Sequence, residues 1–459
     1  MSAWFINWVT KLRSSLWLIP SCMAIPAVFL SLGVPYLDEI FPPAAIPSFP
    51  WLSDLGPEGA MTLLSTIAGS MITIAGLVFS ITIVVLTLAS AQFGPRLLGN
   101  FMRDRGNQVV LGTFVATFLY CLLVLRTIRV NSPGEYTPYW GALVGLVLAI
   151  CSLGVLIYFM HHIAVSIQAP NLITVVYAEL EHAIARLFPE PIGQEHPDEG
   201  NRQEISRVLT GMELEGIPIP ADTSGYLQAI ESDNLVEITR EQNLIFLLYF
   251  RQGHFLVKGL PLGQILIEGT MNETLATRLK QQFICGSQRT QEQNFEFAVL
   301  QLVEVAVRAL SPGINDPFTC IQCIDHLTAI LCQLARRHFP SPYRFDEEGA
   351  LRIIAPPITF TEILNAAFYQ IRQHGEGNVA VTIRLLEGLG RIGECVTREK
   401  DRQAIRAHAA MLQRGSLKSL QEMNDLENIE NRYRRVLAIL SRAEQRSSMS
   451  QEPPRSEVC

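Results

Sequence analysis

Residues that could hold a metal ion gather in one short segment of the 459-residue chain, where Cys320 and Cys323 are followed by His326 and Cys332. Thiolates and imidazoles are typical zinc ligands, and positions three apart on a helix are neighbours. A structural zinc ion takes four ligands, usually from two elements, and the sequence contains no second pair of this kind. We therefore expect neither a metal site nor a redox pair in this segment.

Catalytic signatures are absent from the sequence. It contains no G-x-S-x-G, no H-E-x-x-H, no P-loop and no G-x-G-x-x-G after a strand. We do not expect Lys258 to be a covalently modified carrier lysine, because it falls inside a predicted strand and not at a hairpin tip. We assign no catalytic, cofactor-binding or metal-binding residue and expect no cofactor and no enzymatic activity. No basic tract accompanies the net charge of −7, which argues against nucleic acid as a partner.

A row of small and hydroxyl-bearing residues runs through the second of four long apolar stretches. The members recur at three- and four-residue spacing and so share one helical face: Thr62, Thr66, Gly69, Thr73, Gly76, Ser80 and Thr87. One interpretation is close helix–helix packing, because small side chains let backbones approach each other. The other is the wall of a pore or polar cavity, to which each subunit contributes one such helix. The spacing leaves both interpretations open, and the two can coexist.

Three residues with titratable or charged side chains lie at the ends of apolar stretches. Arg126 follows the third stretch, where its long side chain can reach the membrane interface, although a role in selectivity is the alternative. His161 and His162 lie near the inner end of the fourth stretch. They could sense pH or bind a cation, but an interfacial position without such a role is the simpler interpretation.

The sequence Ser-Pro-Gly-Ile-Asn-Asp-Pro at 311–317 predicts a tight corner between two helices. Pro312 and Gly313 end the first helix, Asp316 can cap the second helix, and Pro317 suits its first turn. With Asn315, these residues form a candidate structural corner. An ion or anion site at the start of the second helix is the alternative.

Four long, mostly apolar stretches of the chain contain no Asp, Glu, Lys or Arg: 14–37, 59–95, 106–125 and 136–178. A helix crosses the hydrocarbon core of a bilayer with about 20 apolar residues. The sequence therefore predicts a membrane α-helical fold with four transmembrane helices, at about 16–34, 60–91, 107–128 and 139–162, in a domain of residues 1–168 that contacts the lipid bilayer. All five tryptophans lie in the first third of the chain, where interfacial anchoring favours them.

Lysine and arginine in the short loops predict the orientation of these helices. The N-terminus carries Lys11 and Arg13, and the second loop carries three arginines, at 96, 103 and 105. The first loop, 35–60, carries neither residue type, whereas Arg126 and Arg129 oppose the trend slightly. We expect a multi-pass protein with both termini in the cytoplasm. The irregular spacing of nine cysteines fits a reducing compartment for the C-terminal half.

The C-terminal half is predicted to be cytoplasmic, with α and β elements. A stalk helix and linker at 169–203 lead to a small β-rich module at 204–290, with strands at 225–230 and 243–250 around a short helix. Gly253, Gly259 and Gly263 are spaced as turns between further strands, a pattern that resembles half of a biotinyl/lipoyl-type barrel. A bundle of amphipathic helices follows at 291–445. The tail, 446–459, is polar and predicted to be disordered.

Four segments together resemble a known family: GSMITIAGLVFSITIVVLTLASAQFGPRLL, GYLQAIESDNL, RQGHFLVKGLPL and RALSPGINDPFTCIQCIDHL. They are similar to predicted bacterial integral membrane proteins that contain domain of unknown function 2254, over roughly residues 15–440. The resemblance implies a bacterial inner-membrane protein with four spans and a cytoplasmic domain. It implies no activity, ligand or catalytic residue.

Two functions are compatible with this organisation. The first is a homo-oligomeric channel or pore, in which the second span lines a path for ions or small solutes and the cytoplasmic domain controls the gate. Four spans without an inverted repeat are few for a self-contained transporter, and oligomerisation would supply the missing walls. The alternative is a membrane-anchored sensor or scaffold whose cytoplasmic domain binds a protein partner or ligand without conduction.

Overall fold

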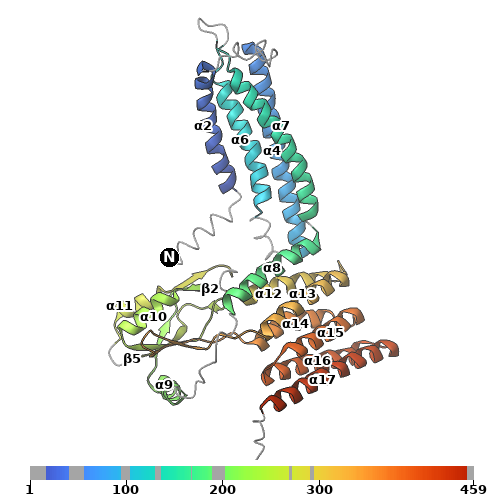
Figure 1. The fold of residues 1–459 in the computed structure, drawn as a ribbon. Coiled ribbons are helices and arrows are strands. Elements are labelled where there is room, and N and C mark those ends of the chain that lie inside the picture. The colour runs from blue at the N-terminus through green and yellow to red at the C-terminus, as the bar shows by residue number, and fades with distance from the viewer. Residues whose placement is uncertain are drawn as a thin grey trace, which may run out of the picture. The chain divides into compact units, whose positions relative to one another are not determined.

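The computed structural model describes residues 17–40, 56–94, 104–129, 136–166, 168–188, 202–267, 271–289 and 294–451. The chain divides into two compact units, Asn7–Asn171 and Leu172–Cys459, which we call the N-terminal and C-terminal units. The predicted N-terminal cations, most of the first and second loops, the linker after position 188 and the end of the tail lie outside the described residues. Figure 1 shows the elements of both units.

Four long helices form the N-terminal unit: α2 (Leu18–Ile40), α4 (Pro57–Phe93), α6 (Arg105–Leu125) and α7 (Tyr139–Ser166). Helix α6 contacts each of the other three and so lies at the centre of the unit. Local signals mark the helix ends. Pro57 occupies the first turn of α4, and the Asp104 carboxylate accepts a hydrogen bond from the Gly106 amide at the start of α6.

The core of this unit consists of aliphatic and aromatic side chains from all four helices, including Leu64, Phe114, Tyr120 and Phe159. Two hydrogen bonds between helices join polar groups that are buried among them. The Tyr120 hydroxyl donates to the carbonyl oxygen of Gly141 over 3.1 Å, and the hydroxyls of Thr117 and Ser152 lie 3.2 Å apart. Such pairing is required where no water reaches.

One carboxylate joins two helices at one end of the unit. Asp38, near the end of α2, accepts hydrogen bonds from the Tyr136 hydroxyl at 2.7 Å and from the Trp140 amide at 3.1 Å. The second bond satisfies a free amide in the first turn of α7, as a cap from within the helix would do.

Five described helices are long and apolar enough to cross a membrane by length and composition alone: α2, α4, α6, α7 and α13 (Pro317–Ala335). The described chain is thus mostly helical, with several candidate spans and a region that contains sheets. The sequence predicts these three features.

The sheets lie in the C-terminal unit. The larger one has the order β1-β5-β3-β8-β7 and the smaller one the order β4-β2-β6. Their strands are β1 (Ile217–Pro220), β2 (Gly225–Ile230), β3 (Leu244–Leu248), β4 (Phe255–Leu256), β5 (Pro261–Ile267), β6 (Phe283–Gly286), β7 (Tyr343–Phe345) and β8 (Leu351–Ile354). All pairs are antiparallel except β3 with β8, which is parallel. Helices α9 (Arg202–Glu215), α10 (Ser232–Glu241) and α11 (Glu273–Lys280) accompany them.

Three details of the strand predictions are wrong. Strands β7 and β8 fall in 291–445, which the sequence pattern assigns to helices alone. Gly263 lies within β5, close against the carbonyl of Leu247 on β3, and not in a turn. Lys258 lies in the turn between β4 and β5 and not in a strand, because Gly259 at φ +85° reverses the chain there. The barrel-like module stays a prediction.

Six further helices of this unit lie within the described residues 294–451: α12 (Phe295–Ala309), α13 (Pro317–Ala335), α14 (Phe360–His374), α15 (Val379–Cys395), α16 (Glu399–Ser419) and α17 (Met423–Gln451). Four of them carry local caps in their first turns. Asn294, Asp316 and Asn378 accept amide hydrogen bonds, and Thr359 with Glu362 forms a capping box.

Helix α8 (Ala169–Leu187) carries Pro170 in its first turn, where proline is tolerated. From Leu172 onward it belongs to the C-terminal unit. The Tyr177 ring packs on His326 of α13 at 4.7 Å, and Phe188 packs edge-on against Phe295 and Phe339.

Candidate functional site

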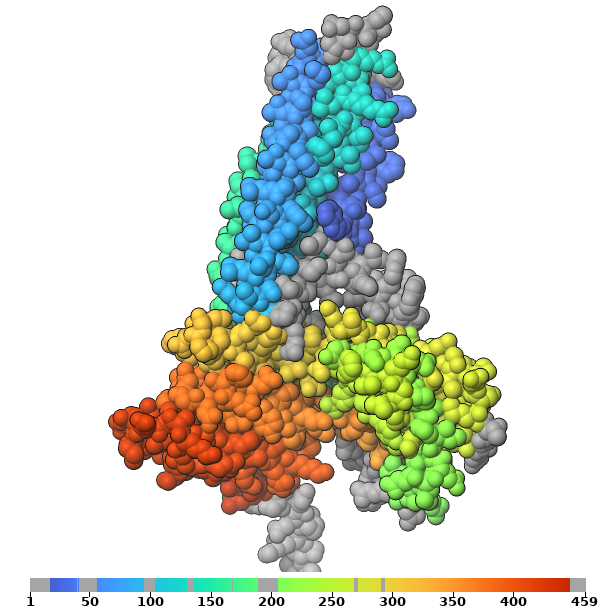
Figure 2. Space-filling model, turned by 180° about the vertical axis from the view of Figure 1, so that it is seen from behind, coloured from blue at the N-terminus to red at the C-terminus, as the bar shows by residue number. Residues whose placement is uncertain are grey.

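All seven members of the small and hydroxyl-bearing row of α4 are exposed in the chain. The buried residues of α4, such as Leu64, Met71 and Val78, lie on the opposite side and pack into the unit. A Cβ placed on Gly69 or Gly76 would meet no atom within 4 Å. Figure 2 shows one long side of α4, in blue, uncovered by other helices of its unit. The row is therefore available to lipid, water or another protein.

The threonine hydroxyls of this row are satisfied by their own helix. Thr62, Thr66, Thr73 and Thr87 each donate to the carbonyl oxygen four residues earlier, over 2.7 to 2.9 Å. A threonine bonded in this way still presents an oxygen on the surface of the helix and tolerates an apolar neighbour. The face is thus weakly polar and free of charge.

Glycines that bring helices together occur in α6 and α7. A Cβ on Gly112 would meet Met23 Sδ at 2.5 Å, one on Gly141 would meet Val124 Cγ1 at 2.7 Å, and one on Gly145 would meet Leu64 Cδ2 at 2.8 Å. These three glycines therefore permit the close packing of the unit. The sequence analysis did not single them out, although small residues in apolar helices are the signal for such contacts.

The structure brings His162 to a carboxylate that the sequence analysis did not consider. His162 Nε2 lies 2.6 Å from Asp104 Oδ2, and the His162 ring stacks on Tyr158 at 5.4 Å. Asp104 also caps α6, so the pair joins the start of α6 to the end of α7. Arg126 is exposed at the C-terminal end of α6.

The corner at 311–317 is built around Asp316. One carboxylate oxygen accepts the amides of Phe318 and Thr319, each at 3.1 Å, and the other accepts the Thr319 hydroxyl at 2.6 Å. The hydroxyl of Thr319 lowers the pKa of Asp316. Pro317 lies at the helix start, and Asn315 adopts φ +49°. The hydrogen bonds that the Asp316 side chain accepts thus all come from the first turn of its own helix. Pro312 and Gly313 lie before it, in the connection between α12 and α13.

The cysteines of α13 face the interior of the helical bundle. Cys320 and Cys323 are fully buried, and burial raises the pKa of the Cys320 thiol to about 12 and that of the Cys323 thiol well above its ordinary value. Thiols in such surroundings are poor nucleophiles and poor metal ligands. Among the described residues, no three His, Cys, Asp or Glu side chains converge on a common point.

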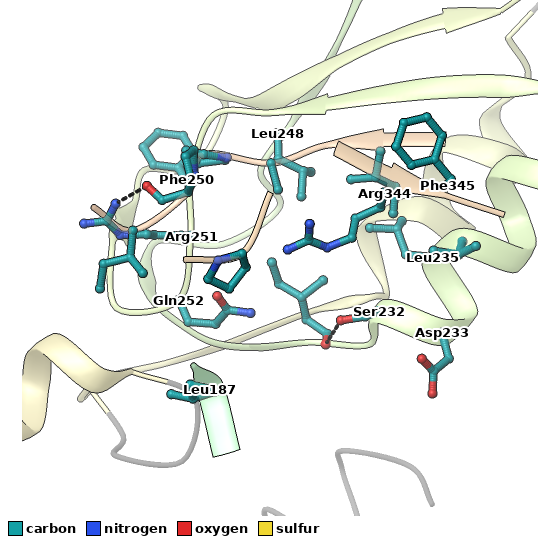
Figure 3. A pocket seen from close by; sticks show the side chains of 18 of the residues that line it. Leu187, Ser232, Asp233, Leu235, Leu248, Phe250, Arg251, Gln252, Arg344 and Phe345 are labelled. Atoms are coloured by element: carbon teal, nitrogen blue, oxygen red, sulfur yellow. Dashed lines mark hydrogen bonds between the residues drawn. The ribbon is translucent and has the colours of Figure 1, made fainter. Parts of the chain in front are cut away.

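A cavity of about 960 Å³ lies in the C-terminal unit, and the sequence analysis did not foresee it. It is bounded by the end of α8, the first two turns of α10, the end of β3, the start of α12, β7, and the segment that follows β8. Figure 3 shows the Arg344 side chain reaching into it between Leu235, Leu248 and Gln252. Its walls come from segments more than 80 residues apart, such as 232–252 and 340–358, so no local sequence pattern predicts it.

The comparisons with known proteins agree with the apolar helices. The family model with the description "Predicted membrane protein (DUF2254)" matches residues 13–391. The chain belongs to this family. Uncharacterized proteins of Mycobacterium bovis and Mycobacterium tuberculosis are 31% identical over 391 residues, which cover 84% of this chain and 74% of each relative. No solved structure matches the chain.

The DUF2254 match includes α4, the corner at 311–317 and every residue that lines the cavity, and it ends inside α15. The relatives carry no described activity in their names. The protein is therefore a predicted membrane protein of a family without an established function, and its function has to be argued from its own residues.

Proposed function

We propose that this DUF2254 protein is a homo-oligomer in the bacterial inner membrane, in which α4 of each subunit lines a path for ions or small solutes. The observation that carries the proposal is the position of the small and hydroxyl-bearing row: it faces away from the other described helices of the N-terminal unit. A weakly polar face that its own subunit leaves uncovered is suited to meet other subunits and the water between them.

The dimensions of α4 support this role. At 37 residues the helix is about 55 Å long, and the row from Thr62 to Thr87 extends over about 38 Å. The hydrocarbon core of a bilayer is about 30 Å thick. The row is thus long enough to cross the core completely, as a lining helix must.

We assign four spans and exclude α13. This helix contacts α12, α14 and α15, and the side chains of Cys320, Ile324 and Leu331 are completely buried among them. Its apolar character serves the core of the helical bundle, since a bundle helix needs no lipid to cover it. The remaining candidates are α2, α4, α6 and α7, and the loop charges favour an orientation with both termini in the cytoplasm.

A second candidate function is a membrane-anchored sensor or scaffold without conduction, in which the C-terminal unit binds a ligand or a protein partner. The cavity in this unit favours it, because its volume of about 960 Å³ is in the range of small-molecule sites. Sensing and conduction are compatible if the ligand controls the gate. Neither function requires catalysis.

Charge placed on α4 tests the channel directly. If the row faces water, Thr73→Asp should assemble and change the ion flux of reconstituted liposomes. The matched control is Ile150→Asp near the middle of α7, whose native side chain is 64% exposed and would face lipid. An Asp at the centre of a span costs about 2.5–3.5 kcal/mol on insertion scales, so Ile150→Asp should fail to insert or assemble.

Bulk placed on α4 is the complementary test. A Cβ on Gly76 meets no described atom within 4 Å, so Gly76→Leu should leave the subunit folded, whereas a Cβ on Gly145 already meets Leu64 and Gly145→Leu should not fold. With a lined path, Gly76→Leu assembles and obstructs flux. Loss of assembly in both Thr73→Asp and Gly76→Leu, together with wild-type liposomes that pass no small ion, would identify a packing face and rule out the channel.

A further inference from the structure

The cavity of the C-terminal unit has an apolar wall and a cationic group. Leu235 and Leu248 are buried at its inner surface, and Phe250 and Phe345 stand beside them. Proline and isoleucine side chains of 353–358 continue this wall. Sites for small molecules combine such apolar surface with a few charged or hydrogen-bonding groups that orient the ligand.

Four arginines and four acidic residues line the cavity, and most of them are engaged with each other or with neighbours: Arg186, Arg240, Arg251, Arg344, Asp233, Glu237, Asp346 and Glu347. Arg251 bonds Glu362 at 3.0 Å and lies 3.7 Å from Glu296, and Asp346 bonds Arg352 at 2.7 Å. Arg240 lies 3.9 Å from Glu347, whose side chain is 94% exposed, so this pair is weak.

Arg344 differs from the other cations of the cavity. Among the described residues, no carboxylate lies within ion-pair distance of its guanidinium. One of its terminal nitrogens donates to the carbonyl oxygens of Ser341 and Tyr343, and the other nitrogens make no hydrogen bond within the described chain. In Figure 3 the guanidinium extends into the cavity, while the carboxylate of Asp233 turns away from it. Arg344 is an exposed residue, and partial desolvation of its guanidinium lowers the pKa of this side chain.

A second group of donors lines the same cavity. Ser232 and Asp233 form the first turn of α10, and no side chain caps that turn. The amide N–H groups at a helix start carry partial positive charge. Together with a guanidinium they supply more donors than the two oxygens of a carboxylate accept, and a phosphate with three free oxygens matches them better.

We propose that this cavity binds a small organic phosphate whose body is apolar or aromatic, with Arg344 as the anchor of the phosphate. The phosphate completes the coordination of Arg344, and the body packs on Leu235, Leu248 and Phe345. The chemistry is shared by nucleotides and by alkyl phosphates derived from lipids. The site does not depend on conduction by α4.

Calorimetric titration of the full-length protein in detergent tests the site. The probes are 1-naphthyl phosphate, 1-naphthol and inorganic phosphate, which carry both parts of the ligand, the aromatic body alone and the anion alone. We expect 1-naphthyl phosphate to bind at least tenfold more tightly than either other probe. AMP and hexyl phosphate then distinguish a nucleotide from an alkyl phosphate as the class of ligand.

The variant Arg344→Gln should weaken binding of 1-naphthyl phosphate at least tenfold, and Arg344→Lys should restore part of it. The matched control is Arg278→Gln on α11, which removes an arginine outside the cavity and should bind like the wild type. Unchanged melting temperatures show that the variants fold. Equal binding by wild type and Arg344→Gln, or no binding of any probe to the wild type, overturns the proposal.

Discussion

The imidazole of His408 is buried in the helical bundle with a single polar partner. Its Nε2 donates to Asn365 Oδ1 at 2.8 Å, and its ring stacks on Tyr369 at 4.8 Å. Burial lowers the pKa of His408 from 6.5 to about 4, and the positive charge of Arg372 acts in the same direction. The native bundle therefore holds this histidine neutral at pH values where the unfolded chain would bind a proton.

The pKa of His408 predicts a loss of stability in mild acid. Because the unfolded chain takes up a proton near pH 6.5 and the native bundle only near pH 4, the stability is complete above 6.5 and falls between these values. The linkage between proton binding and unfolding predicts that the free energy of unfolding falls by about 2 kcal/mol at pH 5. Urea unfolding of the full-length protein in detergent, followed by helix circular dichroism from pH 7.5 to 5, measures it.

The control for this prediction is His408→Gln, which keeps a donor for Asn365 but does not titrate. Carboxylates titrate in both proteins, so the difference between the two pH profiles isolates His408. The wild type should lose more stability than the variant as the pH falls. Parallel profiles would contradict the prediction.

The hydrogen bonds of Asp316 predict how much stability the protein loses when this side chain is removed. Asp316→Ala removes the acceptor for two amides and one hydroxyl at the start of α13, and should cost about 0.5–2 kcal/mol, as N-cap removal does. Asp316→Asn keeps an amide oxygen as acceptor and should cost much less. Chemical unfolding compares the three proteins. An altered flux or ligand affinity in a fully stable Asp316→Ala would point instead to a binding role for the corner.

At the scale of elements, the approach of α13 and α15 depends on one glycine. A Cβ on Gly388 would meet the Thr328 Oγ1 atom at 2.5 Å, and that hydroxyl is buried. Two residues later, a Cβ on Gly390 would meet the ends of the Ile439 and Val436 side chains, at 3.4 and 3.8 Å. Alanine is therefore expected to destabilise the protein at position 388 but not at position 390.

Gly388→Ala should lower the unfolding free energy by about 1–3 kcal/mol, as overpacking of a core does. Gly390→Ala should be neutral or raise it by up to about 1 kcal/mol, because alanine is the better helix former. Urea midpoints of the two variants give the comparison. Removing the obstructing hydroxyl and methyl in Thr328→Ala/Gly388→Ala should recover part of the loss. Equal midpoints for the two single variants would show that Gly388 is not a packing contact.

For the whole molecule, the loop charges predict which part of the chain faces the periplasm. In a variant without native cysteines, one cysteine placed between positions 40 and 55 should react with an impermeant maleimide in intact cells. One at Glu348, in the exposed turn before β8, should react only after the membrane is opened. Labelling of position 348 in intact cells would reverse the orientation.

The sequence by itself was sufficient for features that local chemistry determines. Uncharged stretches set the long apolar helices, the GYLQAI segment predicted β2 at its observed bounds, and Asp316 with Pro317 predicted the start of α13. These features depend on hydrophobic period and on hydrogen bonds between residues three or four apart. The same spacing placed seven residues on one face of α4, but it contained no information on what that face meets.

Tertiary structure decided the features that depend on residues distant in sequence. β8 is short and lies between segments with a helical pattern, so its own sequence did not reveal a strand. It pairs in parallel with β3, about 100 residues earlier. That pairing brings the segment with Arg344 to the helix start at Ser232 and encloses the cavity. Likewise, only the packing of α4 through Leu64 and Met71 turned the opposite, hydroxyl-bearing face outward. Burial of a face and closure of a cavity are decided by which surfaces meet, and that is a property of the folded chain.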